Sequence, residues 1–325
     1  MKSDFRFGII GCGNIASHFV QAAHSLPGVR IVAAAARDIT RSQAFAARHN
    51  IEYAYGDYAA MLRKCELDGV YIATVNTAHL EPMLLALNAG IPVLCEKPIT
   101  LTIEDFDRAA DAAQKNNTLL MEAMWSCFLP SYQAMRELLQ CNTLGRVSTA
   151  YLHFCVPFPK DPNSRIYSPA LGGGLIYDIG VYNLHTAFSL FGDDYKNLSV
   201  SGCLGPTGVD ISSVISFTYP QGPTVCTTTA DVCGPHELLI CGEKGQLYAD
   251  GYNGAQRLTL QPIERPEQIL SYPFACNGFE YEIQEFVSLV EAGCRESAVL
   301  PLSRSRKICA IMESAVQQIK SSEVK

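Results

Sequence analysis

The 325-residue sequence lacks several features, and each absence excludes a class of protein. No run of apolar residues is long enough to span a membrane, and residues 1–6 lead into no apolar segment of a signal peptide. Lysine and arginine form no block and the formal net charge is −7, which argues against nucleic acids and membrane surfaces as partners. The seven histidines show no ligand-like spacing with cysteines or carboxylates, so we expect no metal site.

Cysteine is plentiful, but the spacing typical of metal or redox sites is missing. The thirteen cysteines are scattered, and no two of them have Cys-x-x-Cys spacing. Most lie in apolar runs such as Val93-Leu94-Cys95. We therefore expect small, buried hydrophobic side chains with free thiols, as in proteins of a reducing compartment. Together with the missing signal peptide, this pattern predicts a cytoplasmic protein.

The first third of the chain alternates between strand and helix patterns. This alternation predicts an α/β fold over residues 1–123, a doubly wound parallel sheet with right-handed crossovers. Ligands of such sheets bind beyond the carboxyl ends of the strands. The predicted strands span residues 5–10, 30–36, 69–74, 91–95 and 119–122, and the predicted helices span 14–25, 40–49, 77–89 and 102–116.

The pattern changes after Trp125. Short strands with turn signals recur between residues 198 and 263, which predicts an α+β domain over residues 124–325 with a large, mostly antiparallel open sheet. Residues 157–170 are rich in proline and polar side chains, and we interpret them as a loop over a site. Helices are predicted at residues 130–139, 175–190, 278–292 and 303–320, the last a candidate to pack back on the first domain.

The segment Gly11-x-Gly13-x-x-Ala16 stands between the first predicted strand and the first predicted helix. Gly11 permits a tight turn, Gly13 lets the backbone approach a pyrophosphate, and Ala16 lets the helix pack closely on the strand. The N–H groups of the helix start, at Asn14 and Ile15, would face the phosphates. The position of the motif predicts dinucleotide binding over the alternative of a structural turn with incidental glycines.

The end of the second predicted strand reads Arg37-Asp38, and Arg41 follows. In NAD-binding domains an acidic residue at this point accepts hydrogen bonds from the ribose hydroxyls. An arginine can instead clamp a 2′-phosphate with its planar guanidinium, and Arg41 could add a second charge. We therefore expect NADP rather than NAD; the alternative is that Asp38 binds the ribose and Arg37 is solvated.

Two further strand ends are expected to converge with the glycine loop. They carry Thr74 and Asn76 after one strand, and Glu96 and Lys97 after the next, and all four are expected to bind the cofactor. Lys97 follows an apolar strand directly, so it is expected to reach into a cleft and hold a substrate hydroxyl. The alternative is a solvated lysine at a strand end. The proline after Lys97 allows a cis peptide bond.

The predicted helix after the glycines at 172–174 carries polar residues among apolar ones. Asp178 and Tyr182 are four residues apart and His185 is three further on, so all three share one face of a regular helix. A polar stripe on an apolar helix suggests the wall of a cleft. Satisfied hydrogen bonds within a core are the alternative.

The combined motifs resemble the Gfo/Idh/MocA oxidoreductase family, and within it the branch of dimeric dihydrodiol dehydrogenases and NADP-dependent D-xylose dehydrogenases. The resemblance extends over essentially the whole chain. It implies an N-terminal Rossmann domain and a C-terminal domain on a large open sheet. The residues that carry it are Gly11-Cys12-Gly13-Asn14-Ile15-Ala16, Ala36-Arg37-Asp38, Glu96-Lys97-Pro98, Met121-Glu122-Ala123-Met124-Trp125 and Asp178-Ile179-Gly180-Val181-Tyr182.

The resemblance also implies hydride transfer between NADP(H) and a hydroxyl or carbonyl carbon, with Lys97 and Tyr182 as the catalytic pair. The substrate would be a sugar, a polyol or a trans-dihydrodiol. A phenol has an unperturbed pKa of about 10, so Tyr182 would need a nearby positive charge to accept a proton near neutrality. Cys127 stands where the branch usually has an arginine, so a cation that could shape the pocket is missing from that position.

Five further residues are expected to bind substrate. Asp178 would orient it or balance Lys97, and His185 lies on the same predicted face. His79 could touch substrate or the nicotinamide ribose, or simply begin a helix. Trp125 and Phe154 could wall the pocket, although ordinary core packing explains either one alone.

The sequence also allows expectations about the oligomeric state and about two alternative functions. Large open sheets of this kind often pair face to face, so a homodimer through the C-terminal sheet is expected by analogy. A non-catalytic NADP-binding regulator of the same fold is the main alternative, and retention of both Lys97 and Tyr182 argues against it. A methyltransferase that binds S-adenosylmethionine leaves Arg37 and Lys97 unexplained.

Overall fold

The structure is a computed structural model, which describes residues 4–220 and 222–323. The chain forms two compact units. The first contains the residues up to Trp125 and Ala275–Cys309, and the second contains Ser126–Phe274 and the residues from Ala310 onward. The polypeptide therefore returns to the first unit after it has built most of the second.

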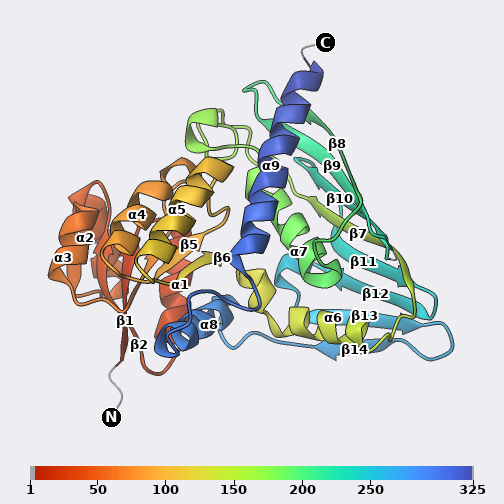
Figure 1. Cartoon of the computed structure of the whole chain (residues 1–325), viewed down its shortest axis with the longest axis horizontal. Coiled ribbons are helices and arrows are strands. Elements are labelled where there is room, and N and C mark those ends of the chain that lie inside the picture. The colour runs from red at the N-terminus through yellow and green to blue at the C-terminus, as the bar shows by residue number, and fades with distance from the viewer. Residues whose placement is uncertain (1–3, 221, 324–325) are drawn as a thin grey trace. The chain divides into compact units, whose positions relative to one another are not determined.

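The first unit is built on a sheet of six parallel strands in the order β3-β2-β1-β4-β5-β6 (Figure 1). This order confirms the predicted doubly wound sheet. The strand order reverses between β1 and β4, which is where such sheets bind ligands. The strands are β1 (Phe5–Ile10), β2 (Val29–Ala35), β3 (Tyr53–Tyr55), β4 (Gly69–Ile72), β5 (Val93–Glu96) and β6 (Leu120–Ala123).

Helices cover both faces of this sheet. Side chains of α3, α4 and α5 share a buried apolar cluster with one face. On the other face, Phe19 of α1 and Phe286 of α8 both pack against Phe7 of β1. The sequence patterns missed β3 and α3, because a strand of three residues and a helix of seven are too short to show a period. The helices are α1 (Asn14–His24), α2 (Ile39–His49), α3 (Tyr58–Lys64), α4 (Leu80–Asn88), α5 (Ile103–Lys115) and α8 (Phe279–Glu291).

The second unit is built on a sheet of eight strands in the order β14-β13-β12-β11-β7-β10-β9-β8. Neighbours are antiparallel except β7 and β10, which are parallel, so the prediction of a large, mostly antiparallel sheet is confirmed. The strands are β7 (Val147–Cys155), β8 (Asn197–Leu204), β9 (Asp210–Thr218), β10 (Thr224–Ala230), β11 (His236–Gly242), β12 (Gly245–Asp250), β13 (Arg257–Pro262) and β14 (Gln268–Ser271).

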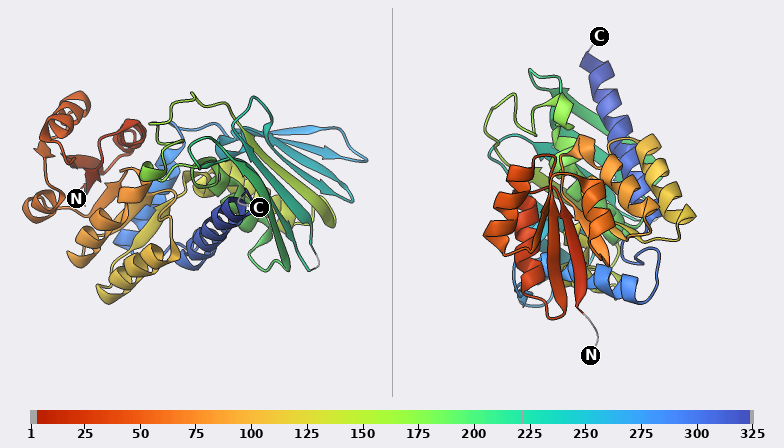
Figure 2. Two further views of the ribbon diagram at one scale, coloured as in Figure 1. Left: turned by 90° about the horizontal axis from the view of Figure 1, so that it is seen from above. Right: turned by 90° about the vertical axis from the view of Figure 1, so that its left-hand side faces the viewer.

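One face of the eight-stranded sheet carries the helices of the second unit (Figure 2). They are α6 (Pro130–Gln140), α7 (Val181–Phe191) and the later part of α9 (Leu302–Glu323). The opposite face bears exposed apolar side chains, among them Tyr151, Val214 and Ile269. Alternation along β7 produces this division, since Leu152 and Phe154 are buried while Tyr151 between them points outward.

All thirteen cysteines lie among the described residues and are free thiols. The prediction of small buried side chains is wrong for four of them, Cys141, Cys203, Cys233 and Cys294, which are exposed. Within the two described stretches of chain, no helix has both the length and the hydrophobicity needed to cross a bilayer.

Candidate functional site

The glycine loop between β1 and α1 has the geometry of an anion-binding turn. Gly11 has φ of 99°, and a Cβ atom there would lie 2.5 Å from the carbonyl oxygen of Ala73, so only glycine fits. A Cβ atom on Gly13 would face open space, and no side chain caps α1. The first N–H groups of α1 are therefore left for an anion, with no acidic residue in the first turn to repel it.

Two arginines and a capped aspartate form the tip of β2. Arg37 and Arg41 are exposed. Oδ1 of Asp38 accepts hydrogen bonds from the N–H and the hydroxyl of Thr40, at 2.9 Å and 2.7 Å, and this holds the pKa of Asp38 below its usual range. Asp38 thus acts as the N-cap of α2. Because Asp38 is engaged as a helix cap, Arg37 is the better candidate to bind the 2′ group of a cofactor's ribose.

Tyr58, which the sequence patterns did not single out, lies close to the same cations. Burial raises the pKa of its hydroxyl, while the charges of Arg37 and Arg41 oppose the shift. Arg41 also acts on Cys12 of the glycine loop, whose pKa burial raises to about 11. The positive charge of Arg41 therefore lies near the glycine turn, an arrangement compatible with a dinucleotide that carries a 2′-phosphate. No sequence period marks Tyr58, because it begins the short helix α3.

The segment after β4 is held by His79. Its ring is 1% exposed, with Nδ1 3.0 Å from the carbonyl oxygen of Pro98 and Nε2 3.1 Å from that of Thr74. The Thr74 hydroxyl donates to the carbonyl oxygen of Ala78, and Asn76 opens a short 3₁₀ turn, Asn76–Ala78. His79 therefore joins the turns that follow β4 and β5, both of which carry predicted site residues.

Glu96 and Lys97 lie at the carboxyl end of β5. Glu96 is buried, and its carboxylate accepts hydrogen bonds from the hydroxyl of Tyr71 and from the N–H of Lys97. Burial raises the pKa of Glu96, whereas the charge of Lys97 and the bond from Tyr71 lower it. The peptide bond between Lys97 and Pro98 is cis, as the sequence allowed.

Trp125 follows β6 and is half-buried. Its ring lies parallel to that of Phe279, with centroids 5.4 Å apart and planes at 12°. Phe279 begins α8, which is separated from Trp125 by most of the second unit in sequence. Part of the Trp125 ring is therefore engaged in packing within the first unit.

Tyr182 and Asp178 lie in the second unit, and the helix that carries them starts irregularly. The sequence predicts a regular helix from residue 175, but the turn Ile176–Gly180 is π-helical and α7 begins only at Val181. Asp178 and Tyr182 are therefore not related by regular α-helical spacing, which corrects the argument that placed them on one face. Asp178, Tyr182 and His185 are all buried, with exposures of 5%, 9% and 1%.

An aromatic cluster lies next to Tyr182. The ring of Phe154 is 5.7 Å from that of Tyr182 and stacks on His236 at 3.9 Å. The Tyr252 hydroxyl donates to Oδ1 of Asn183 at 2.5 Å, and Tyr252 also packs edge-on against Phe154. Phe154 thus contacts Tyr182 directly, and His236 and Tyr252 are members of this wall that the sequence did not reveal, because they come from other strands and turns.

Asp178 forms an ion pair with Arg165 of the loop over residues 157–170. The Arg165 side chain is 59% exposed and that of Asp178 7%. Cys127, at the position where the family branch usually has arginine, is fully buried. A cation does therefore meet Asp178, and it comes from the loop.

The same loop is anchored at a second carboxylate, Asp231, just after β10. Asp231 accepts hydrogen bonds from the N–H of Phe158 at 2.9 Å, from the ammonium of Lys160 and from the hydroxyl of Tyr167. These bonds hold the pKa of Asp231 below its usual range against the effect of burial. Asp231 thus holds the loop from both ends, and Asp178 holds it through Arg165.

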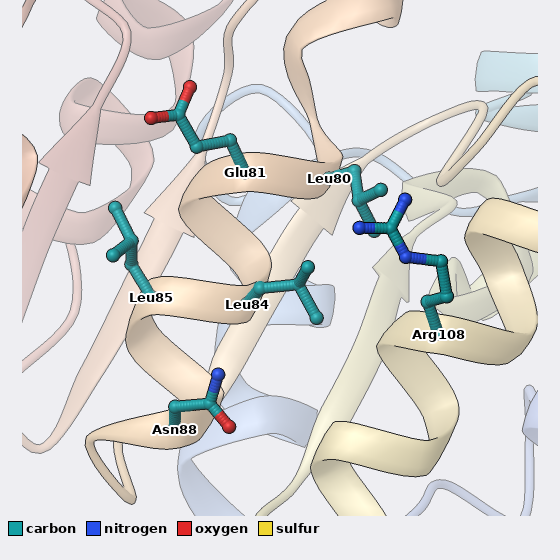
Figure 3. Close-up of a pocket in the computed structure, with 6 residues that line it drawn as sticks. All are labelled: Leu80, Glu81, Leu84, Leu85, Asn88 and Arg108. Atoms are coloured by element: carbon teal, nitrogen blue, oxygen red, sulfur yellow. The ribbon is translucent and has the colours of Figure 1, made fainter.

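A surface hollow of about 270 Å³ lies elsewhere in the first unit, between α4 and α5 (Figure 3). It is lined by Leu80, Glu81, Leu84, Leu85, Asn88 and Arg108. None of these residues belongs to the predicted site.

Comparison with known proteins gives matches over nearly the whole chain. Residues 5–124 match the family described as "Oxidoreductase family, NAD-binding Rossmann fold", and residues 132–248 match the "GFO/IDH/MocA C-terminal domain". A trans-1,2-dihydrobenzene-1,2-diol dehydrogenase from Xenopus tropicalis is 32% identical over 97% of this chain and 98% of its own. The scyllo-inositol 2-dehydrogenase (NADP(+)) IolU from Bacillus subtilis (strain 168) is 29% identical over 97% of each chain.

Solved structures share the fold. That of KijD10, a 3-ketoreductase from Actinomadura kijaniata in complex with NADP and TDP-benzene, has a TM-score of 0.87 at 24% identity, over 97% of this chain and 98% of its own. The two-unit architecture thus agrees with the match to both family descriptions and with the full-length relatives. The chain belongs to the Gfo/Idh/MocA family of oxidoreductases, as its motifs indicated.

Proposed function

We propose that the chain is an NADP-dependent dehydrogenase or reductase that acts on a hydroxyl or carbonyl carbon of a sugar, a polyol or a trans-dihydrodiol. The observation that carries this proposal is the edge of the first unit's sheet. There the glycine turn, the arginines at the tip of β2 and Lys97 at the end of β5 all follow carboxyl ends of strands in one parallel sheet. The names of the relatives, a dihydrodiol dehydrogenase and an inositol dehydrogenase, support the substrate class.

The cofactor would be held by backbone and cationic groups of this chain. The N–H groups at Asn14 and Ile15 would face the pyrophosphate, and Arg37 with Arg41 would clamp the 2′-phosphate. The capping role of Asp38 supports NADP over NAD. Thr74 and Asn76 would line the nicotinamide half of the site.

Lys97 and Tyr182 are proposed as the catalytic residues. When bound, the nicotinamide of NADP supplies or accepts the hydride. The Lys97 ammonium would bind the reacting oxygen, and its charge would favour the phenolate form of Tyr182. Tyr182 would accept the hydroxyl proton during alcohol oxidation and return it during carbonyl reduction.

The remaining predicted residues would shape the substrate pocket. Phe154, which contacts the Tyr182 ring, would form an apolar wall. Asp178, held by Arg165, would accept a hydrogen bond from a second substrate hydroxyl. His185 and Trp125 would border the same pocket. His79 would act at the edge of the site through the two turns that it joins.

A turnover assay tests the proposal. Formation of NADPH would be followed by absorbance with a panel of aldoses, inositols, other polyols and trans-dihydrodiols, with NAD in a parallel series. Oxidation of at least one class with NADP supports the proposal. Tight NADP binding without turnover on the whole panel would point to the non-catalytic regulator instead.

We also propose a cytoplasmic homodimer that pairs through the open face of the eight-stranded sheet. The free thiols support a reducing compartment. The exposed Tyr151, Val214 and Ile269 on the helix-free face support an interface there. Light scattering coupled to gel filtration measures the mass, and Val214→Lys would shift a dimer of this kind to the monomer.

A further inference from the structure

Tyr71 and Glu96 form a buried pair next to Lys97 in the first unit. Tyr71 lies on β4 and Glu96 ends β5, and their exposures are 0% and 6%. The Tyr71 hydroxyl donates to Oε1 of Glu96, and the N–H of Lys97 donates to Oε2 at 3.2 Å. Both carboxylate oxygens are therefore engaged by the chain itself.

The Tyr71 side chain has little freedom to move. Its ring stacks on that of Phe19, with centroids 3.7 Å apart and planes at 8°, and both rings are fully buried. Phe19 belongs to α1, the helix that follows the glycine turn. The hydroxyl that holds Glu96 is therefore fixed relative to the helix at the proposed pyrophosphate site.

The charged groups around this pair explain why the Tyr71 hydroxyl affects the ionisation of Glu96. Burial raises the pKa of Glu96, and Glu122 acts in the same direction. Lys97 and the Tyr71 bond favour the ionised carboxylate. The pKa of Tyr71 is raised by burial and by the neighbouring acidic groups of Glu96, Glu282 and Cys95, so Tyr71 keeps its proton and remains a donor.

We propose that Tyr71 is a positioning residue that holds the Glu96 carboxylate, ionised, as the internal counter-charge of Lys97. A buried carboxylate needs hydrogen-bond donors to remain charged, and Tyr71 supplies such a donor inside the protein. The ionised Glu96 in turn favours a charged Lys97 at the reacting oxygen. Glu96 was predicted to bind cofactor; in the structure its buried carboxylate bonds to the Tyr71 hydroxyl and to the main-chain N–H of Lys97. The inference rests on the proposed catalytic role of Lys97.

The test compares Tyr71→Phe with wild type in the full-length chain. The variant loses one hydroxyl and keeps the ring that stacks on Phe19. The acid limb of the kcat/KM profile should move to higher pH by about one unit, since Glu96 becomes harder to ionise. The dissociation constant of NADP should change by less than about twofold, because Tyr71 lies behind the site rather than in it.

A second readout needs no substrate. Thermal unfolding of Tyr71→Phe should show a larger loss of Tm at pH 8 than at pH 5, because the ionised carboxylate accepts a stronger hydrogen bond from the hydroxyl than the neutral carboxyl group does. Tyr219→Phe is the matched control, since it removes a buried hydroxyl that donates to the carbonyl oxygen of Gly192 at 2.9 Å. Its loss of Tm should be the same at both pH values.

Glu96→Gln separates charge from packing. It keeps the shape of the side chain but carries no charge, so its Tm difference from wild type should also depend on pH. If Tyr71→Phe and Glu96→Gln both show wild-type pH dependence of Tm and turnover, the inference is overturned. If instead Lys97→Met retains full turnover, the proposed catalytic role of Lys97 fails, whatever the Tyr71 variant does; if wild type turns over no compound of the panel with NADP, the proposed function itself fails.

Discussion

Arg165 forms an ion pair with Asp178, four residues before Tyr182, and so fastens the loop over residues 157–170 to the wall of the proposed pocket. Asp178 is buried while Arg165 is partly exposed. Loss of the arginine would leave a buried carboxylate without its cation, and the loop would lose one of its two anchors.

Replacement of Arg165 by alanine should therefore raise the substrate KM by about fivefold, which corresponds to about 1 kcal/mol once solvent exposure of the arginine is allowed for. NADP affinity should stay the same, because Arg165 belongs to the second unit. Steady-state kinetics provide the measurement. Arg146→Ala removes an exposed pair with Glu243 of the same unit and serves as the control. An unchanged KM would show that the loop does not depend on this pair.

Lys97→Met should abolish turnover and leave NADP binding largely intact. Methionine retains the apolar stem of lysine but cannot bind the reacting oxygen or supply charge. NADPH formation and the NADP dissociation constant are measured together. Lys115→Met, at an exposed position at the end of α5, provides the control. Retained activity would remove Lys97 from the mechanism.

Tyr182→Phe should reduce kcat by at least about 100-fold, the lower end of what general acid–base catalysis contributes. It should also flatten the alkaline side of the pH profile, because the phenol no longer titrates. Tyr132→Phe is a suitable control, since it removes a buried hydroxyl bonded to Thr186 at 2.7 Å. Near-normal rates for Tyr182→Phe would contradict proton transfer by this residue.

Arg37→Ala should weaken NADP binding by about 1.5–3 kcal/mol and change NAD binding little, since one charge-assisted contact to the 2′-phosphate is lost. Isothermal titration with both cofactors measures the difference. Arg48→Ala is the control for loss of positive charge in general, because Arg48 is exposed near the end of α2, the helix that follows Arg37. Equal weakening of both cofactors would overturn the assignment of NADP.

Asp210→Asn should change how stability depends on pH. Asp210 is buried and accepts the N–H of Ile176 at 2.8 Å; burial raises its pKa from 3.8 to about 6. Because the folded state binds the proton more tightly than the unfolded state, wild type loses stability as pH rises from about 4 to about 6, by about 3 kcal/mol.

Asparagine does not titrate, so the stability of wild type relative to Asp210→Asn should fall over that range and be constant above it. Chemical denaturation at a series of pH values measures this difference. Asp194→Asn, at an exposed carboxylate of the same unit, should show no such trend. A pH-independent difference for Asp210→Asn would show that Asp210 is charged in the folded protein throughout.

Local patterns in the sequence were sufficient for most elements of the first unit, but not for the short β3 and α3. Apolar runs and helical periods placed β1 and α1 within one residue of their observed bounds. The Gly11-x-Gly13 spacing located the glycine turn, because a tight turn and an uncapped helix start depend on neighbouring residues only. Arg37 could be singled out for the same reason, as the first residue beyond β2.

The contacts around the candidate site residues of each unit join residues that no local sequence pattern pairs. Arg165 with Asp178, Asp231 with the loop, Tyr71 with Glu96 and Trp125 with Phe279 depend on which strands and helices become neighbours. The fold class and the glycine turn follow from local backbone preferences and motif spacing, and the candidate catalytic residues follow from the family resemblance, so all of these could be predicted from the sequence. Which buried carboxylate faces which donor depends on the tertiary fold, because burial of a charge is tolerated only where the fold brings a partner to it.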